Sequence, residues 1–310
     1  MMLHPGPMSS EHTVLMVGSM AFDDLELPSG KFDNVIGGAA TYSALAATLF
    51  APARMVAVVG EDFPTATLQT LEHRGADTQG VQRAAGKTFR WKGRYAADLS
   101  SRETLDTQLN VFADFSPQLP PEYRSSPFVL LGNIHPQLQL EVLSQVQRPR
   151  LVAADTMNFW IEGERATLHK MLSHIDTLII NDEELRLLAE DHNIRRSAQR
   201  VLTLGPKRLI VKRGDAGALL FEGPDAFFAP AMPLHEELDP TGAGDTFAGA
   251  LMGYLASQGA VDHQTLRQAM LVGAAVASIC VEGVGNSKLL EANETTVQAR
   301  LDEIKQMLAF

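Results

Sequence analysis

Runs of almost uninterrupted apolar residues recur along the chain, and most of them precede a stretch with helical spacing. The runs occupy residues 13–19, 54–60, 128–133, 150–155, 177–182 and 208–214. Strands that are covered on both faces are apolar throughout, whereas strands with one exposed face alternate apolar and polar positions. The repeated order of strand and helix indicates parallel βαβ units. We therefore predict a layered α/β fold around a mostly parallel sheet.

Two segments depart from this rhythm. Residues 20–36 and about 87–115 mix aromatic and charged residues at short intervals, which is typical of exposed strands. We predict that they form a small β-sheet lid over a cleft. The last third is rich in helical patterns, at 243–256, 262–280 and 294–308. The expected organisation is one α/β domain over 13–310, with the two lid segments inserted and residues 1–12 disordered.

Composition narrows the classes of partner. The chain has 310 residues, 45% of them hydrophobic, and a formal net charge of −11 with no long basic block. This balance argues against nucleic acid or an anionic membrane as the main partner. No apolar segment approaches the roughly 20 residues of a membrane span, and the start lacks the pattern of a secretory signal. We expect a cytoplasmic protein in which the single cysteine, Cys280, is a buried structural thiol.

One predicted helix has an unusual entrance, DPTGAGDTFAGAL at residues 239–251. Interior glycine costs about 1 kcal/mol relative to alanine, so Gly242 and Gly244 indicate that something approaches the backbone closely. Unpaired N–H groups and the helix dipole make such a tip an anion site. Asp245 would repel a phosphate there unless a hydroxyl stood between them, which is the arrangement of phosphoryl transfer. The alternative is an ordinary helix start that Thr241 caps.

The whole string resembles the C-terminal signature of the ribokinase-like, or PfkB, carbohydrate kinase family. Four more motifs resemble that family in order and spacing: GSMAFDD at 18–24, GG at 37–38, NDEE at 181–184 and VKRGDAGALLF at 211–221. The resemblance implies a ribokinase-like three-layer α/β sandwich with a small β-sheet lid. It implies an ATP-dependent kinase acting on a hydroxymethyl group of a sugar or sugar derivative. A nucleoside kinase and a non-catalytic sugar- or nucleotide-binding regulator are the alternatives.

The resemblance also implies roles at the phosphate end of the site. Asp245 would be the catalytic base, and Gly242, Ala243 and Gly244 would form the anion hole, in agreement with the reasoning from the residues alone. Asn181 and Glu184 would hold Mg²⁺ through water. Their alternative is an acidic first turn of a helix. Nucleotide-binding positions are expected at Lys212, Gly214, Gly217 and Thr241, although the two glycines also fit a plain β-turn.

On the acceptor side, Asp23 matches the family's substrate carboxylate, and Gly37 and Gly38 match its substrate turn. A plain turn into a helix is the alternative for the glycines. Ala21 and Tyr42 stand where the family commonly has asparagine. Both replacements remove amide groups that would bind sugar hydroxyls, so the family's usual furanose substrate does not follow from the resemblance. Candidate acceptor-binding residues are Asp23, Gly37, Gly38, Tyr42 and Asn158, and the nearby Trp160 offers a stacking face.

Two further implications concern an ion and assembly. Asp239 and Ser287, together with Thr241 and Gly283, lie where some family members bind a monovalent cation such as K⁺. Lids of this type often pair, so a homodimer through the lid is expected.

Two other patterns are the basic residues of the lid and a string similar to a Walker A loop. The lid residues Arg90, Lys92, Arg94 and Arg102 either grip a substrate phosphate or balance Asp98, Glu103 and Asp106 across exposed strands; we favour the second. GVQRAAGKT at 80–88 has the wrong glycine spacing for a Walker A loop and precedes a strand pattern, so we reject that interpretation.

Overall fold

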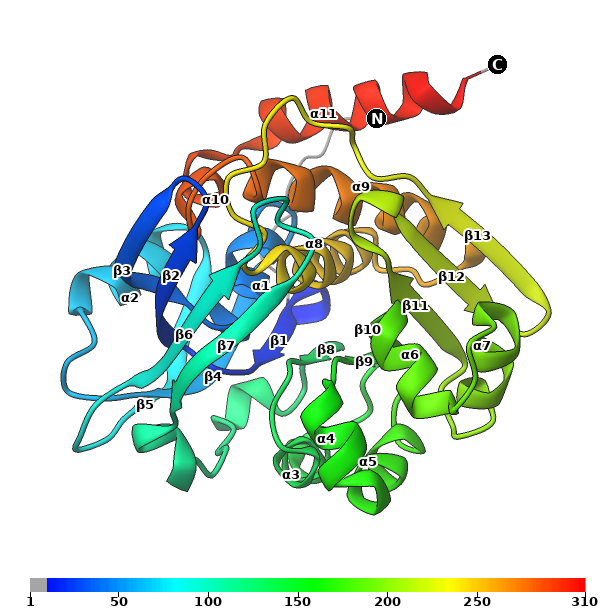
Figure 1. Ribbon diagram of the computed structural model, residues 1–310. Coiled ribbons are helices and arrows are strands. Elements are labelled where there is room, and N and C mark those ends of the chain that lie inside the picture. Colours follow the sequence, from blue (N-terminus) through cyan, green and yellow to red (C-terminus); the bar gives the residue numbers. More distant parts are fainter. Residues whose placement is uncertain (1–9, 310) are drawn as a thin grey trace.

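The computed structural model describes residues 10–309, which form three layers, a large sheet between two layers of helices (Figure 1). The sheet has nine strands in the order β13-β12-β11-β10-β9-β8-β1-β4-β5. They are β1 Val14–Val17, β4 Ala53–Val59, β5 Ala76–Arg83, β8 Phe128–Leu131, β9 Leu151–Ala154, β10 Thr177–Asn181, β11 Arg208–Lys212, β12 Ala218–Glu222 and β13 Asp225–Ala229. Neighbouring strands from β5 to β11 are parallel, and β12 is antiparallel to both of its neighbours. The predicted mostly parallel sheet is confirmed.

The predicted burial of both sheet faces is clearest in β1. Val14 and Met16 join one hydrophobic cluster, Leu15 and Val17 join the other, and each is at most 1% exposed. The first cluster lies under helices α1 Ala39–Ala47, α2 Thr65–His73, α8 Ala243–Gln258, α9 His263–Cys280, α10 Ser287–Glu291 and α11 Glu294–Leu308. The second lies under α3 Pro136–Gln145, α4 Asn158–Gly163, α5 Arg165–Leu172, α6 Asp182–Ala189 and α7 Ile194–Leu202. A β1 without polar positions is thus explained by helices on both sides.

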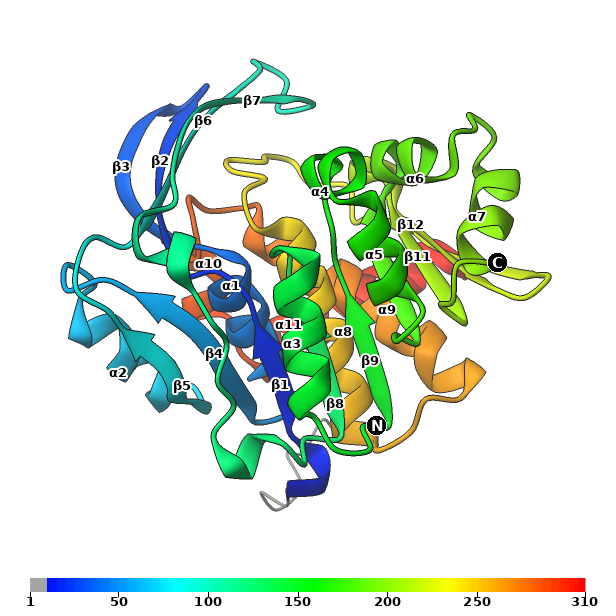
Figure 2. The same ribbon diagram turned by 90° about the horizontal axis from the view of Figure 1, so that it is seen from below.

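A small sheet of four strands, ordered β3-β2-β6-β7, comes from the two segments that break the rhythm. Its strands are β2 Ala21–Leu27, β3 Gly30–Gly37, β6 Phe89–Tyr95 and β7 Arg102–Gln108. Figure 2 shows it standing off the body of the molecule at the edge where α4 and α6 begin. Strand structure ends earlier than predicted, because residues 110–114 form a 3-10 helix whose first residue, Asn110, is left-handed at φ +49°.

Four other expectations can be compared with the structure. Of residues 1–12, only 10–12 are described, and they form a 3-10 helix; residues 1–9 lie outside the described part of the chain. Residues 80–88 continue β5 and then form a loop, so no helix follows as a Walker A loop requires. Cys280 is fully buried in α9, and burial raises the pKa of its thiol to about 12. Across residues 10–309, no helix combines the length and apolar character of a membrane span.

Helices α1 and α8 pack unusually closely. An added Cβ on Gly249 would lie 2.2 Å from the carbonyl oxygen of Ser43, and one on Gly253 would lie 2.7 Å from the Cα of Ala47. Only glycine allows the two backbones to approach this far. The helices therefore begin side by side, α1 at Gly38 and α8 at Gly242.

Candidate active site

The predicted anion hole is the first turn of α8. Gly242 caps the helix in the left-handed region at φ +75°, which glycine adopts without strain. Ala243, Gly244 and Asp245 begin the helix, so their N–H groups have no helical acceptor and the positive end of the dipole lies there. The N–H of Ala243 donates to the carbonyl of Pro240 at 3.2 Å. The structure thus forms a helix tip of the kind that binds anions.

Asp245 lies half-buried among charged groups rather than in packed hydrocarbon. Burial raises the pKa of its carboxyl to about 6, and the nearby charge of Asp155 also raises it. Lys212 and Arg102 act in the opposite direction. A carboxyl with this pKa can accept and release a proton near neutral pH.

Tyr42 lies beneath the tip. An added Cβ on Gly242 would meet its ring at 2.4 Å, so the aromatic face packs directly on the glycine. The side chain is 1% exposed, and its hydroxyl has no hydrogen-bond partner within residues 10–309. The expected contact with an acceptor does not fit this burial. Tyr42 instead supports the backbone of the anion hole.

Asp23 lies on β2 against the di-glycine turn. An added Cβ on Gly37 would lie 1.8 Å from Oδ2 of Asp23, so only glycine leaves room for the carboxylate. Asp23 is 4% exposed. Burial, together with the charges of Asp239 and Asp245, raises its pKa to about 7. The structure therefore brings the two predicted carboxylates, Asp23 and Asp245, into one charged site.

Gly38 makes the turn into α1. Its φ of +94° favours glycine, and an added Cβ would lie 2.4 Å from the carbonyl oxygen of Ser19. That carbonyl accepts the N–H of Ala40 at 2.9 Å, and Ser19 Oγ accepts the N–H of Ala39 at 3.2 Å. Gly38 therefore has a structural reason to be glycine that is independent of any substrate.

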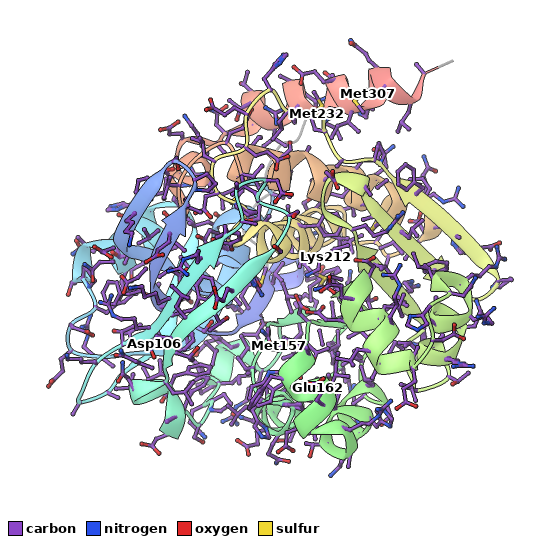
Figure 3. The ribbon with its side chains drawn as sticks, in the orientation of Figure 1. Asp106, Met157, Glu162, Lys212, Met232 and Met307 are labelled. Atoms are coloured by element: carbon purple, nitrogen blue, oxygen red, sulfur yellow. The ribbon has the colours of Figure 1, made fainter. Side chains whose placement is uncertain are left out.

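Lys212, the last residue of β11, reaches the tip of α8 and lies between α8 and α6 in the view of Figure 3. Its Nζ donates to Oδ2 of Asp155 at 2.9 Å and would lie 2.9 Å from an added Cβ on Gly244. Burial alone would lower the pKa of Lys212, but Asp155, Glu184 and Asp245 raise it above its ordinary value. The ammonium is therefore a permanent positive charge at the anion hole.

Asn181 and Glu184 form the capping box of α6. Glu184 Oε2 accepts the Asn181 N–H, and Asn181 Oδ1 accepts the Glu184 N–H, both at 2.8 Å. The structural alternative is therefore real, yet it leaves Oε1 of Glu184 and one lone pair of Asn181 Oδ1 unused. Burial and then Asp155 raise the pKa of Glu184 to about 7, against the effect of Lys212. The neighbouring negative charges of Glu184 and Asp155 suit a cation that keeps most of its waters.

Thr241 links the anion-hole loop to the small sheet. Its hydroxyl lies 2.8 Å from the Tyr95 hydroxyl, and its N–H donates to Oδ1 of Asp239 at 2.9 Å. The other oxygen, Oδ2, accepts the N–H of Gly285 at 2.8 Å. Ser287 is exposed and donates to the carbonyl of Val284 at 2.9 Å. No contact joins it to Asp239 within the described chain.

The two glycines after β11 differ in environment. Gly214 is exposed at φ +56°, with nothing within 4 Å of an added Cβ. Gly217 is buried, and an added Cβ would lie 2.3 Å from the carbonyl oxygen of Ala229 on β13. Packing against that strand explains Gly217 without a nucleotide.

Most basic residues of the small sheet form ion pairs, as we favoured, but mainly with other partners than those predicted. The pairs are Arg90 with Asp24 at 2.7 Å, Lys92 with Glu26 at 3.9 Å, Arg94 with Glu26 at 2.7 Å and Arg94 with Glu103 at 3.6 Å. Asp98 and Asp106 instead accept hydrogen bonds from Ser100 and Gln108. The parallel pairing of β2 with β6, which the sequence pattern did not reveal, explains the difference.

Arg102 is the exception, because it has no carboxylate within ion-pair distance in the described residues. Its guanidinium lies 5.7 Å from the ring centroid of Trp91, whose indole crosses Gly93 and donates to Thr104 at 3.2 Å. It is paired in register with Tyr95, so both side chains leave the same face of the sheet. Its charge lowers the pKa of Asp23, Glu184 and Asp245.

Trp160 and Asn158 lie on α4. Trp160 Nε1 donates to Asn133 at 3.0 Å, and the ring lies beside His135 and Phe159, at centroid distances of 4.9 and 4.8 Å. Phe159 is 62% exposed. Asn158 is exposed, and no hydrogen bond of its side chain is recorded in the described part of the structure.

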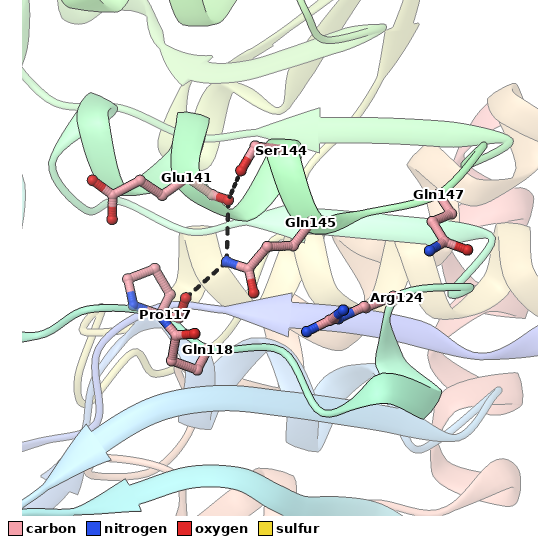
Figure 4. A pocket seen from close by; sticks show the side chains of 7 residues that line it. All are labelled: Pro117, Gln118, Arg124, Glu141, Ser144, Gln145 and Gln147. Atoms are coloured by element: carbon pink, nitrogen blue, oxygen red, sulfur yellow. Dashed lines mark hydrogen bonds between the residues drawn. The ribbon is translucent and has the colours of Figure 1, made fainter.

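Two surface hollows lie elsewhere. One of about 540 Å³ is lined by Pro117, Gln118, Arg124, Glu141, Ser144, Gln145 and Gln147. Figure 4 shows Gln145 crossing it to donate to the carbonyls of Pro117 and Glu141, at 2.9 and 3.1 Å. The other, of about 630 Å³, lies between β13 and α9. Neither contains a residue of the site above. Over residues 10–309, no three acidic, histidine or cysteine side chains gather as a metal cluster.

A helix-tip anion site, a titrating carboxylate beside it and a second carboxylate facing a glycine turn define a kinase of hydroxyl-bearing small molecules. Comparison with known proteins agrees. Residues 12–293 match the family described as pfkB family carbohydrate kinase. The chain belongs to that family, and it is an ATP-dependent kinase of a sugar or a nucleoside.

The individual relatives and solved structures share between 19 and 29% of their residues with this chain. The chain is similar to a cytidine kinase of Thermococcus kodakarensis, with 29% identity over 247 residues that cover 78% of this chain and 88% of the relative. The nucleoside kinase of Methanocaldococcus jannaschii has a similar structure, with a TM-score of 0.76 and 20% identity over 94% of this chain and 98% of that one. An E. coli protein described as ribokinase II, in complex with ATP and Mg²⁺, has a TM-score of 0.77 and 19% identity over 94% and 99%. The predicted ribokinase-like fold is confirmed.

Proposed function

We propose that the protein transfers the γ-phosphoryl group of ATP to a hydroxymethyl group held between Asp23 and Asp245. The observation that carries the proposal is the meeting of these two carboxylates in front of the tip of α8, where Asp245 raises the pKa of Asp23. Asp23, with the backbone at Gly37 and Gly38, binds acceptor hydroxyls. This arrangement leaves the reacting hydroxyl near Asp245.

The step follows from this placement. The acceptor oxygen forms a bond to the γ-phosphorus, the bond from that phosphorus to the bridging β,γ-oxygen breaks, and ADP leaves. Asp245 takes the hydroxyl proton. The N–H groups of Gly242 and Gly244 hold the charge on the transferred group, and the N–H of Ala243 is shared between that group and the carbonyl of Pro240. Lys212 adds a point charge at the same place.

We further propose that ATP lies along Lys212, Gly214, Gly217 and Thr241 and that Mg²⁺ lies near the capping box of α6. Asn181 and Glu184 fit this ion because the cap leaves Oε1 of Glu184 and the second lone pair of Asn181 Oδ1 as possible ligands, and because the neighbouring carboxylate of Asp155 adds negative charge. When bound, Mg²⁺ neutralises and orients the phosphates. Magnesium keeps several of its waters, so few direct protein ligands are needed.

For the acceptor, a nucleoside is the first candidate and a free sugar or sugar derivative the second. Similarity to a cytidine kinase supports the nucleoside. So does the aromatic group at α4, where the exposed Phe159 stands beside Trp160 and offers a face for a base. Asn158, in the same turn, is an accessible amide for a polar edge.

Three properties complete the proposal. We propose Asp239, near Thr241, as a ligand of a K⁺ site through the lone pairs that its two backbone hydrogen bonds leave unused, with Ser287 as a weaker candidate because its hydroxyl is turned to Val284. The small sheet closes over the acceptor and excludes water, and it pairs two copies into a homodimer. The protein works in the cytoplasm on small molecules, without nucleic acid or membrane partners.

The test is ADP formation with cytidine, uridine, adenosine, inosine, ribose and fructose, each with MgATP. Product formation from a nucleoside but not from ribose supports the first candidate. Turnover of a sugar alone would select the second. Tight binding of these ligands, measured by thermal shift, without any turnover would instead indicate a regulator and refute the enzymatic proposal.

A further inference from the structure

Asp155 follows β9 and belongs to none of the motifs that predict the site. It is 7% exposed and has a complete set of contacts. Oδ1 accepts the N–H of Thr156 at 2.7 Å, and the backbone carbonyl accepts Nε2 of Gln139 at 3.0 Å. Oδ2 accepts the ammonium of Lys212 at 2.9 Å. Its carboxylate is therefore fixed in direction by neighbours from the sheet edge.

Three carboxylates, those of Asp155, Glu184 and Asp245, act on the ammonium of Lys212. Glu184 and Asp245 are both close enough to raise its pKa, but the hydrogen bond goes to Asp155. This choice holds Nζ beside Gly244, whose missing side chain leaves the space that the ammonium fills. A lysine that bonded to Asp245 instead would block the carboxylate that has to accept the acceptor proton.

We propose that Asp155 is a positioning residue that holds the ammonium of Lys212 at the tip of α8 and keeps it from pairing with Asp245. The inference rests on the proposed function of Asp245 as the base. Lys212 then contacts the transferred phosphoryl group, while Asp155 acts through it. The ion pair leaves Asp245 free to take the proton.

The pair also predicts the pH dependence. The side chains that face or approach Asp245 come from five other elements: Asp155 after β9, Lys212 on β11, Arg102 on β7, Asp23 on β2 and Cys280 on α9. After burial, Asp155 raises the pKa of Asp245, and Lys212 lowers it. Removing one or the other should move the acid limb of the rate in opposite directions. An ion pair remote from Asp245 would move neither, and the non-additive loss in the double variant separates positioning from a charge effect alone.

The experiment compares Asp155→Asn, Lys212→Met and the double variant, using the acceptor that the wild-type enzyme phosphorylates. Loss of one charged hydrogen bond to phosphate is expected to reduce kcat/KM for ATP about 10- to 100-fold in each single variant. The acid limb of kcat should shift to lower pH in Asp155→Asn and to higher pH in Lys212→Met. The double variant should be no slower than Lys212→Met, because Asp155 acts only through the lysine.

Asp176→Asn is the matched control. Asp176 accepts the ammonium of Lys207 at 2.8 Å, before the starts of β10 and β11, at the opposite edge of the sheet. This variant should keep the wild-type pH profile. If Asp155→Asn is too unstable to assay, the double variant still reports, since it leaves no unpaired charge.

Two results would overturn the inference: an acid limb that Asp155→Asn leaves in place, or strictly additive losses in the double variant. Failure of the proposed function is distinguishable, because the wild-type protein would then turn over no acceptor.

Discussion

Replacing Gly37 by alanine tests the acceptor site at a single methyl group. The new Cβ would lie 1.8 Å from Oδ2 and 2.6 Å from Cγ of Asp23. Both distances are too short for a Cβ that is not bonded to these atoms. The obstructing atoms are the end of a side chain that can rotate away, and Gly37 does not have a positive φ. The fold should therefore survive while the carboxylate leaves its position.

The size of the effect follows from the lost interaction. A hydrogen bond to a charged group contributes about 1.5–3 kcal/mol, which corresponds to about a 10- to 150-fold loss of kcat/KM for the acceptor. The KM for ATP should change little, because the tip of α8 is not disturbed. Steady-state ADP formation with acceptor and ATP varied separately measures both.

Two other glycines provide controls. Gly38→Ala would place Cβ 2.4 Å from a backbone oxygen at φ +94°, so it should lower Tm. Gly163→Ala meets nothing within 4 Å and should resemble wild type in both assays. Wild-type acceptor kinetics in Gly37→Ala would refute the assignment of Asp23 to the acceptor. A drop in Tm equal to that of Gly38→Ala would refute the expectation that the Asp23 side chain rotates away without cost to the fold.

The remaining predictions concern charge. Asp245→Asn should fold normally and lose about 10²- to 10⁴-fold in kcat; a smaller loss would mean that another group takes the proton. The wild-type kcat should fall as pH drops below about 6, where Asp245 becomes protonated; a profile that is flat down to pH 5 would contradict this. Folding raises the pKa of Asp23, Glu184 and Asp245, so their stabilising effect is complete below their ordinary values and is lost as pH rises through about 6 to 7. The Tm of the ligand-free protein should therefore fall between about pH 4 and 7, and scanning calorimetry that shows a rise would be inconsistent with it. Arg102→Ala should reduce kcat at least tenfold more than Arg94→Ala, since only Arg94 already has carboxylate partners; equal losses in the kinetic assay would assign Arg102 a structural role.

Local patterns predicted the sheet, the small sheet and the entrance to α8 because each depends on neighbouring residues. Apolar runs mark strands covered on both faces, and a crowded glycine string marks a helix tip. The partners of these elements depend on long-range pairing. Arg90 and Arg94 find Asp24 and Glu26 because β6 lies beside β2, and nothing in either segment alone indicates that neighbour.

The same limit explains the residues that were not predicted as part of the site. Asp155 and Tyr95 are ordinary in their local sequences. They become important only because β9 lies two strands from β11, and β6 approaches the loop before α8. Tyr42 shows the converse, since its position in a motif suggested contact with substrate while packing places its ring under Gly242.

The glycine contacts between α1 and α8 fix the distance between the proposed binding sites of the phosphoryl donor and the phosphoryl acceptor. In the proposed mechanism one helix starts at the turn that binds the alcohol and the other at the tip that binds the phosphate, and the contacts of Gly249 and Gly253 set the distance between the two helices. Variation in the small sheet can therefore change which alcohol is admitted while the reach of the transfer stays constant. A methyl group at either glycine would alter that reach for every substrate at once.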